Sequence, residues 1–150
     1  MSRFIKWDTP FVNSKFPSAV ILIQDNSARR DCVSALVSPS GIDEYPKYLV
    51  HFGDVIAFTC MEEMHFPNRG FEEVDCEETG LASYQFIDSP WLESYRNGEF
   101  FLFNLDGGNR EVPRHYMIFG GDNNIEVITK NDPTFEVVNS PRVLSLDYHI

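Results

Sequence analysis

The chain has 150 residues and a formal net charge of −11, from 23 acidic and 12 basic side chains, and this length is typical of one domain. Its hydrophobic fraction of 43% excludes a disordered or collagen-like protein, and its longest apolar run, Ala19–Ile23, is too short to cross a bilayer. Nucleic acid and anionic membranes are unfavourable partners because they repel an acidic chain. We expect one soluble domain over residues 1–150.

The N-terminus and the cysteines indicate a compartment. Lys6 and Asp8 interrupt the first apolar residues, so the N-terminus lacks the continuous apolar segment of a secretory signal. The three cysteines are odd in number and form no short pairing motif: Cys32, Cys60 and Cys76. Free thiols are typical of a reducing compartment. Together these features predict a cytoplasmic protein.

Short strands separated by turns are the main pattern in the N-terminal part. Ala19–Ile23 is a β-branched apolar run between turn-forming residues, which predicts a strand with a well-buried face. Residues 32–37 fit a second strand better than the alternative, a short helix. Lys47–Thr59 alternates on both sides of Gly53 and predicts a long central strand that bulges or bends at this glycine.

One helix and one hairpin are predicted farther along the chain. Asp88 or Ser89 can cap a short helix that ends near Gly98. Residues 114–119 and 125–130 flank a turn rich in glycine and asparagine, which predicts a β-hairpin. These elements predict an α+β fold: a mainly antiparallel β-sheet of about five or six strands in a meander of hairpins, with one or two short helices.

No standard catalytic signature occurs in the sequence. The nucleophile elbow and the zinc-protease, P-loop, dinucleotide and paired-cysteine motifs are all missing. His115 beside Tyr116 could act as a general base, and His51 is similar, but a hydrogen-bonded structural histidine is the commoner case. We predict no catalytic residue, and we favour a non-enzyme over an enzyme.

Two groups of side chains have the chemistry of metal ligands without a matching motif. Cys60, His65 and Cys76 could bind zinc, but their spacing fits no common site and supplies no fourth ligand. Separate thiols and a surface histidine are the favoured alternative. Oxygen-bearing side chains suggest a calcium loop at Asn104, Asp106, Asn109 and Glu111, but their spacing does not follow the EF-hand pattern of a fixed glycine and a glutamate at the twelfth loop position. A polar turn is the favoured alternative. No metal and no cofactor is predicted.

The negative charge is concentrated in the middle of the chain. The alternating pattern stops between residues 61 and 80, where seven acids and one base lie with two phenylalanines. Apolar anchors flanked by charge are typical of tight interfaces, so this segment is the predicted partner-binding surface; a loop that only keeps the protein soluble is the alternative. The predicted partner-binding residues are Glu62, Glu63, Phe66, Phe71, Glu72, Glu73, Asp75, Glu77 and Glu78.

Several short motifs resemble those of small bacterial proteins of the toxin-immunity type. They lie within residues 45–130 and are Tyr48-x-Val50-x-Phe52, Glu62-Glu63, Ser89-Pro90-Trp91-Leu92-Glu93, His115-Tyr116 and Ile125-Glu126-Val127-Ile128. The resemblance implies a non-catalytic inhibitor that neutralises a basic toxin, often a nuclease, by covering its active cleft. It assigns no binding residue.

Two classes of function follow. The first is a protein-binding module, an immunity-like inhibitor whose acidic segment attracts a basic protein partner. The second is a small-ligand-binding protein or enzyme with a pocket lined by the many Phe and Tyr side chains. A pocket with convergent polar groups favours the second class, and an acidic surface without such a pocket favours the first.

Overall fold

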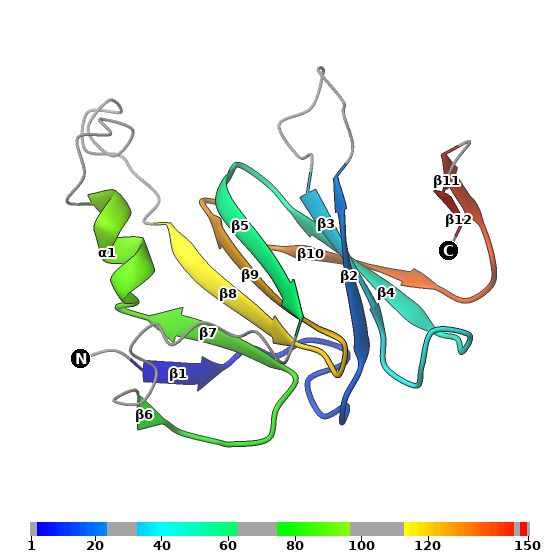
Figure 1. The fold of residues 1–150 in the computed structure, drawn as a ribbon, viewed down its shortest axis with the longest axis horizontal. Helices are drawn as coiled ribbons and strands as arrows, with labels where there is room; N and C mark the ends of the chain where they lie inside the picture. Colours follow the sequence, from blue (N-terminus) through cyan, green and yellow to red (C-terminus); the bar gives the residue numbers. More distant parts are fainter. Residues whose placement is uncertain (1–2, 24–32, 63–74, 97–112, 146–147, 150) are drawn as a thin grey trace.

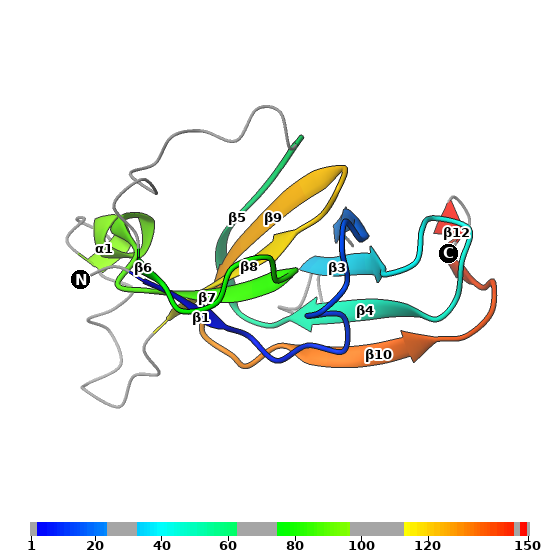
Figure 2. The same ribbon diagram turned by 90° about the horizontal axis from the view of Figure 1, so that it is seen from below.

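The computed structural model describes residues 3–23, 33–62, 75–96, 113–145 and 148–149. The described strands form a six-stranded sheet, a four-stranded sheet and a two-stranded ribbon, and Figures 1 and 2 show how these are arranged. In spatial order, the six-stranded sheet contains Val55–Glu62 (β5), Asn123–Thr129 (β9), Arg114–Phe119 (β8), Ser83–Ile87 (β7), Arg3–Lys6 (β1) and Asp75–Cys76 (β6). The four-stranded sheet contains Thr134–Val138 (β10), Lys47–Phe52 (β4), Val33–Ser38 (β3) and Ser18–Ile23 (β2), and the ribbon pairs Val143–Ser145 (β11) with Tyr148–His149 (β12).

The predicted antiparallel, β-rich character is confirmed, and only β1 and β6 pair in parallel among the described strands. The predicted number of strands is wrong, because the two main sheets contain ten strands in the described residues. Strands as short as β1 and β6 are too short to show periodicity in a sequence. The finer α+β class stays a prediction, since the described helix content is one helix of seven residues.

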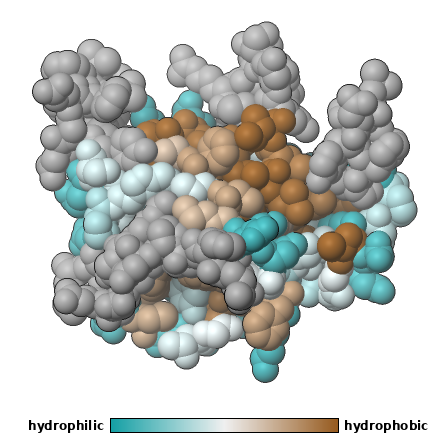
Figure 3. All heavy atoms as spheres, in the orientation of Figure 1, coloured by the Kyte–Doolittle hydropathy of each residue, from teal (hydrophilic) through white to brown (hydrophobic). Residues whose placement is uncertain are grey.

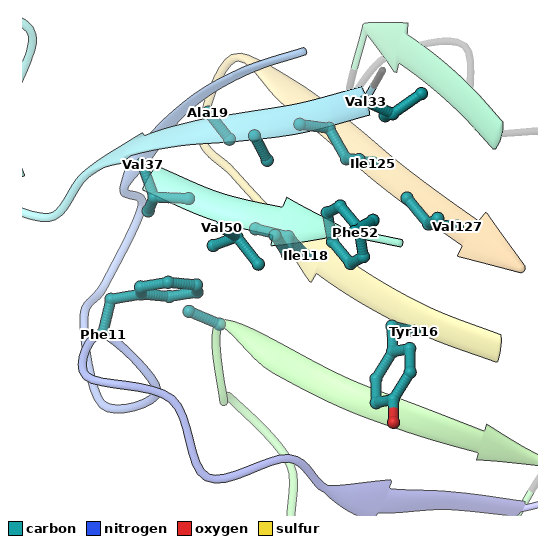
Figure 4. Close-up of a cluster of buried hydrophobic side chains, with 12 residues drawn as sticks. Phe11, Ala19, Val33, Val37, Val50, Phe52, Tyr116, Ile118, Ile125 and Val127 are labelled. Atoms are coloured by element: carbon teal, nitrogen blue, oxygen red, sulfur yellow. The ribbon is translucent and has the colours of Figure 1, made fainter. Parts of the chain in front are cut away.

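The two main sheets pack their inner faces against one core (Figure 4). Its buried residues come from both sheets: Val33, Ala35, Val37, Val50 and Phe52 from the four-stranded sheet, and Tyr116, Ile118, Ile125 and Val127 from the six-stranded sheet. Alternate residues of the four-stranded sheet point the other way and form a second, smaller apolar cluster: Leu22, Leu36, Leu49 and Val138. Because side chains alternate between the two faces of a strand, one set of apolar residues faces the core between the sheets. The other set lies on the opposite face of the four-stranded sheet.

Residues 47–62 and 123–138 pair along their length and pass together from one sheet to the other. β4 pairs with β10 in the four-stranded sheet, and β5 pairs with β9 in the six-stranded sheet. Asp54 has a φ of 47° at the bend, and the Thr129 hydroxyl donates to the carbonyl of Gly53. The predicted bend at Gly53 is confirmed. The single central strand is wrong, because only β4 is interior while β5 is an edge strand of the other sheet in the described chain.

The other local predictions agree with the structure. β2 and β3 occupy the two predicted N-terminal strands, and β8 and β9 form the predicted hairpin. The helix α1 covers Pro90–Arg96, and the side chain of Ser89 caps it by accepting the amide hydrogen of Leu92 over 2.9 Å. The predicted end at Gly98 lies outside the described residues. Within the described chain, no helix has the length and apolarity needed to cross a membrane.

The turn between β8 and β9 is attached to the first residues of β2, which fixes the two sheets relative to one another at this end. Asp122 accepts hydrogen bonds from the amide of Ala19 (3.0 Å) and the hydroxyl of Ser18 (2.8 Å). The amide of Gly121 donates to the carbonyl of Pro17 over 2.8 Å. A Cβ at Gly120 would lie 2.6 Å from the carbonyl oxygen of Asn123, so this close approach requires glycine.

Candidate functional site

The predicted acidic segment is described only at its two ends. Glu63, Phe66, Phe71, Glu72 and Glu73 lie outside the described residues. Glu62 ends β5 and Asp75 begins β6, and these two strands are the opposite edges of the six-stranded sheet. The described acids therefore form two separate groups, one at each edge, and not one continuous surface.

At the first edge, β5 exposes an apolar row that ends in an acid. Phe58, Cys60 and Glu62 are its exposed side chains. Phe58 and Cys60 pair with Val127 and Ile125, which belong to the main core. The face of the six-stranded sheet that packs on the core at β9 is therefore exposed to solvent where it reaches the edge strand β5.

The end of β2 adds a second apolar group to this region. Ile23 is 63% exposed and Phe58 is 37% exposed, and Figure 3 shows hydrophobic residues gathered around β2 on this face of the molecule. Cys60 connects the two strands, because its sulfur accepts a hydrogen bond from the backbone of Ile21. We define the β5–β2 patch by its five exposed members: Ile23, Phe58, Cys60, Glu62 and Asp122.

The thiol of Cys60 is a weak acid in this setting. Partial burial is the main cause that raises its pKa, and the carboxylate of Asp122 raises it further, whereas the hydrogen bond to the backbone of Ile21 acts in the opposite direction. A raised pKa keeps the sulfur in its neutral thiol form, which is the less nucleophilic form. Cys60 therefore contributes apolar surface to the patch.

At the second edge, a rigid turn holds the remaining acids. The hydroxyl of Tyr84 donates to the carbonyl of Glu78 over 2.7 Å and accepts the amide hydrogen of Leu81 over 3.0 Å, so it joins the two ends of the turn. Glu77 pairs with Arg3 over 3.3 Å at the surface. Asp75, Glu77 and Glu78, which we call the acidic turn, are all exposed. Burial is the first cause that raises the pKa of Tyr84, which keeps its hydroxyl protonated as a donor.

A cavity of about 460 Å³ lies beside the acidic turn. It is bounded by the segment before β2, by residues 80–82 and by the β8–β9 hairpin, and its lining includes Ser14, Lys15, Phe16, Leu81, Phe119 and Asn124. Two of its lining residues, Phe16 and Phe119, are aromatic. None of the described residues that line this cavity is a histidine or carries a carboxylate.

His115 belongs to a buried chain of hydrogen bonds under α1. Its Nδ1 lies 2.8 Å from the hydroxyl oxygen of Ser89, and its Nε2 lies 2.9 Å from a carboxylate oxygen of Glu126. The ring also packs against Trp91, with 5.2 Å between ring centroids. Serine, histidine and a carboxylate in this order are the components of a hydrolytic triad. However, Ser89 is 0% exposed and caps the helix, so its hydroxyl is closed to a substrate.

His51 forms a similar chain on the outer face of the four-stranded sheet. Its Nδ1 lies 3.0 Å from the hydroxyl oxygen of Ser34, and its Nε2 lies 3.0 Å from a carboxylate oxygen of Glu136. Glu136 also pairs with Arg142. The hydrogen bonds from Arg142 and His51 lower the pKa of Glu136. Ser34 lies inside β3, which is paired on both sides, so the ladder occupies the neighbouring amides that an oxyanion would need.

Cys60 and Cys76, which the sequence analysis named as possible zinc ligands, lie far apart in the six-stranded sheet. Cys60 is on β5 and Cys76 is on β6, at opposite edges. His65 and the oxygen-rich stretch 104–111 lie outside the described residues. Within the described part of the chain, no three side chains from His, Cys, Asp and Glu are grouped in a way that could hold a metal ion.

Sequence reasoning named both histidines but missed their partners. His51 and Glu136 are 85 residues apart, and His115 and Ser89 are 26 residues apart. Only the strand register and the helix position bring them together. Asn124, which lines the cavity, and Tyr84, which holds the acidic turn, also carried no signal, since each belongs to an ordinary strand pattern. Comparison of the chain with family models, curated proteins and solved structures gives no match.

Proposed function

We propose that the protein is a non-catalytic binding module, an immunity-like inhibitor, that recognises a basic protein partner in the cytoplasm. The observation that carries this proposal is the β5–β2 patch, in which apolar Phe58 and Ile23 and acidic Glu62 and Asp122 are all exposed. An apolar centre with a charged rim is the usual anatomy of a specific interface.

Electrostatics support a basic partner. The net charge of −11 produces a negative field that attracts a cationic protein over long range and speeds its association. The acidic turn is already fixed by the Tyr84 hydroxyl. Binding there requires little ordering of the backbone, so a smaller entropic cost opposes association. The patch and the acidic turn are then two contact regions at opposite edges of one sheet.

The chemistry of the described nucleophiles supports a non-catalytic protein. Ser89 is a buried helix cap, and Ser34 lies within a fully paired strand. Cys60 has a raised pKa. Each of these groups has a structural use that competes with nucleophilic attack.

The test begins by isolating the partner on the immobilised wild-type protein and measuring its affinity by calorimetry at low and high salt. We expect a basic protein whose affinity falls as salt rises. The double variants Phe58→Ala/Glu62→Lys and Glu77→Lys/Glu78→Lys should each weaken binding about tenfold or more. The quadruple variant Glu72→Lys/Glu73→Lys/Glu77→Lys/Glu78→Lys tests the remainder of the predicted segment in the same way.

The matched control is Asp43→Lys/Glu44→Lys, which reverses two exposed acids in the loop between β3 and β4. It should leave the affinity within about twofold of wild type at high salt, where long-range attraction is screened. Equal losses in the control and in the patch variant would contradict a local binding surface. An acidic partner, or an affinity that does not change with salt, would contradict the electrostatic part of the proposal.

A further inference from the structure

The cavity beside the acidic turn has the size of a small-molecule site and an unusual wall. Its volume of about 460 Å³ falls within the range of natural ligand pockets. Phe16 on its wall is 79% exposed and has a φ of 55°. Bulky residues rarely adopt a positive φ, and such strain is often kept where it serves a site.

The backbone at Phe16 is held in this conformation by the neighbouring hairpin. A Cβ at Gly121 would lie 3.0 Å from the Cβ of Phe16, so glycine allows the two segments to touch. The amide of Gly121 donates to the carbonyl of Pro17. Phe16 therefore lines the cavity from a backbone position that these contacts hold, while most of its surface remains exposed.

Asn124 places a polar group without a protein partner in the cavity wall. The residue is 6% exposed, and among the described residues its side-chain amide makes no hydrogen bond. A buried amide without a partner lowers stability, because it loses its hydrogen bonds to water and gains none in return. A ligand that hydrogen-bonds to this amide would remove that cost, since a side-chain amide offers both donors and an acceptor.

Lys15 adds a positive charge at the same cavity. It lines the cavity, is exposed, and forms no ion pair with the described acids. Its ammonium group stands out in a protein with a net charge of −11. A carboxylate on a ligand could accept hydrogen bonds from both Lys15 and the Asn124 amide.

We propose that this cavity binds a small aromatic carboxylate, with the ring against Phe16 and Phe119 and the carboxylate on Lys15 and Asn124. Aromatic rings pack favourably on aromatic walls, and the two donors supply charge and direction. This site is independent of the proposed partner-binding surfaces, because it shares no residue with the β5–β2 patch or the acidic turn.

The probe is 3-phenylpropionate, titrated into the full chain and followed by backbone amide NMR shifts. We expect saturable shifts confined to residues 14–16, 80–82 and 119–124, with a dissociation constant of about 0.1–1 mM, which is reasonable for a ligand of this size. The uncharged 3-phenylpropan-1-ol and the ringless butyrate should each bind about tenfold more weakly. These two compounds separate the contribution of the carboxylate from that of the ring.

Three variants test the assigned contacts. Lys15→Met should weaken 3-phenylpropionate about tenfold and leave 3-phenylpropan-1-ol unchanged, whereas the control Lys130→Met should change neither. Asn124→Leu should weaken the carboxylate while keeping or raising the melting temperature, because it replaces an unpartnered amide with an apolar group of similar size. A merely structural Asn124 would instead lower the melting temperature.

Three results would overturn the proposal: no saturable binding of 3-phenylpropionate to the wild type, equal binding of the acid and the alcohol, or a lower melting temperature for Asn124→Leu. Each can occur whether or not the patch variants lose a protein partner, so failure of this site and failure of the proposed function are distinguishable.

Discussion

The Nε2 atom of His115 lies 2.9 Å from a carboxylate oxygen of Glu126, and the two side chains are only 1% and 2% exposed. Removing two ionisable groups from water is costly, and their mutual interaction offsets the cost only while both are present. Ser89 occupies the second ring nitrogen and Thr59 approaches the second carboxylate oxygen at 3.4 Å. This buried pair therefore connects α1, β8, β9 and β5.

Loss of either partner should destabilise the protein strongly. We expect Glu126→Ala to lower the free energy of unfolding by about 3–5 kcal/mol, because it leaves His115 buried without its acceptor. Urea denaturation followed by fluorescence measures the change. The double variant His115→Leu/Glu126→Leu should recover part of the stability. A loss below about 1 kcal/mol in Glu126→Ala would contradict the importance of this pair.

Replacing Ser89, which caps α1, should lower the stability of the protein more than replacing a serine within α1. Ser89→Ala removes the cap on the Leu92 amide and one hydrogen bond of His115, so we expect a loss of about 1–2 kcal/mol. The control is Ser94→Ala. Among the described residues, the exposed Ser94 hydroxyl bonds only to the carbonyl of Trp91, so this variant should change stability by less than about 0.5 kcal/mol. Equal effects in thermal unfolding would contradict the role of Ser89.

The hydroxyl of Tyr84 should be required for the acidic turn. Tyr84→Phe removes the donor to Glu78 and leaves the amide of Leu81 without its acceptor, which we expect to cost about 1–3 kcal/mol. Hydrogen exchange should show faster exchange at the amide of Leu81. Tyr48→Phe is the control, because the Tyr48 ring packs against Phe11 and its hydroxyl has no hydrogen bond among the described residues. Unchanged exchange in Tyr84→Phe would contradict the clamp.

Glu136 should stabilise the protein above its ordinary pKa and cease to do so in acid. Its pKa is lowered from 4.5 by the hydrogen bond from Arg142 and then by that from His51. A lowered pKa in the folded state means that the stabilisation is present above pH 4.5 and is lost as the pH falls through the lowered value. Because Glu136 is 41% exposed, solvent screening limits the effect to about 1 kcal/mol or less.

The measurement compares wild type with Glu136→Gln in urea near neutral pH and well below pH 4.5. The variant should be the less stable protein near neutrality, and the difference should shrink in acid. Arg142→Met removes the first cause of the shift and should show the same dependence on pH. A difference that stays constant or grows on acidification would contradict this account.

Local elements were predictable where the signal lies within a few neighbouring residues. The caps around Ser89 placed α1, the turn chemistry at residues 120–124 placed the β8–β9 hairpin, and β-branched alternation placed β2 and β4. The bend at Gly53 was also predicted. Its consequence was not, since no residue pattern shows that β4 and β5 pair with different parts of the same partner segment in two different sheets.

The predicted partner-binding residues are described only at the two ends of their segment, and the binding surface stays a prediction. Acidic and apolar residues were expected to form one binding surface, yet Glu62 and Asp75 lie at opposite edges of the six-stranded sheet. Exposed Phe58 and Ile23 looked like ordinary strand residues in the sequence. Their exposure depends on where one sheet stops covering the other, and strand periodicity contains no information about that boundary.

The sequence by itself determined the β-rich antiparallel character, the capped helix, the hairpin and the acidic charge, because backbone preferences and charge are properties of single residues and close neighbours. Only the tertiary structure decided which polar side chains meet. His115 reaches Glu126 and His51 reaches Glu136 through strand register, and the cavity at Phe16 forms where three distant segments converge. Burial and register depend on the whole chain, since a shift of one residue in a strand exchanges its two faces.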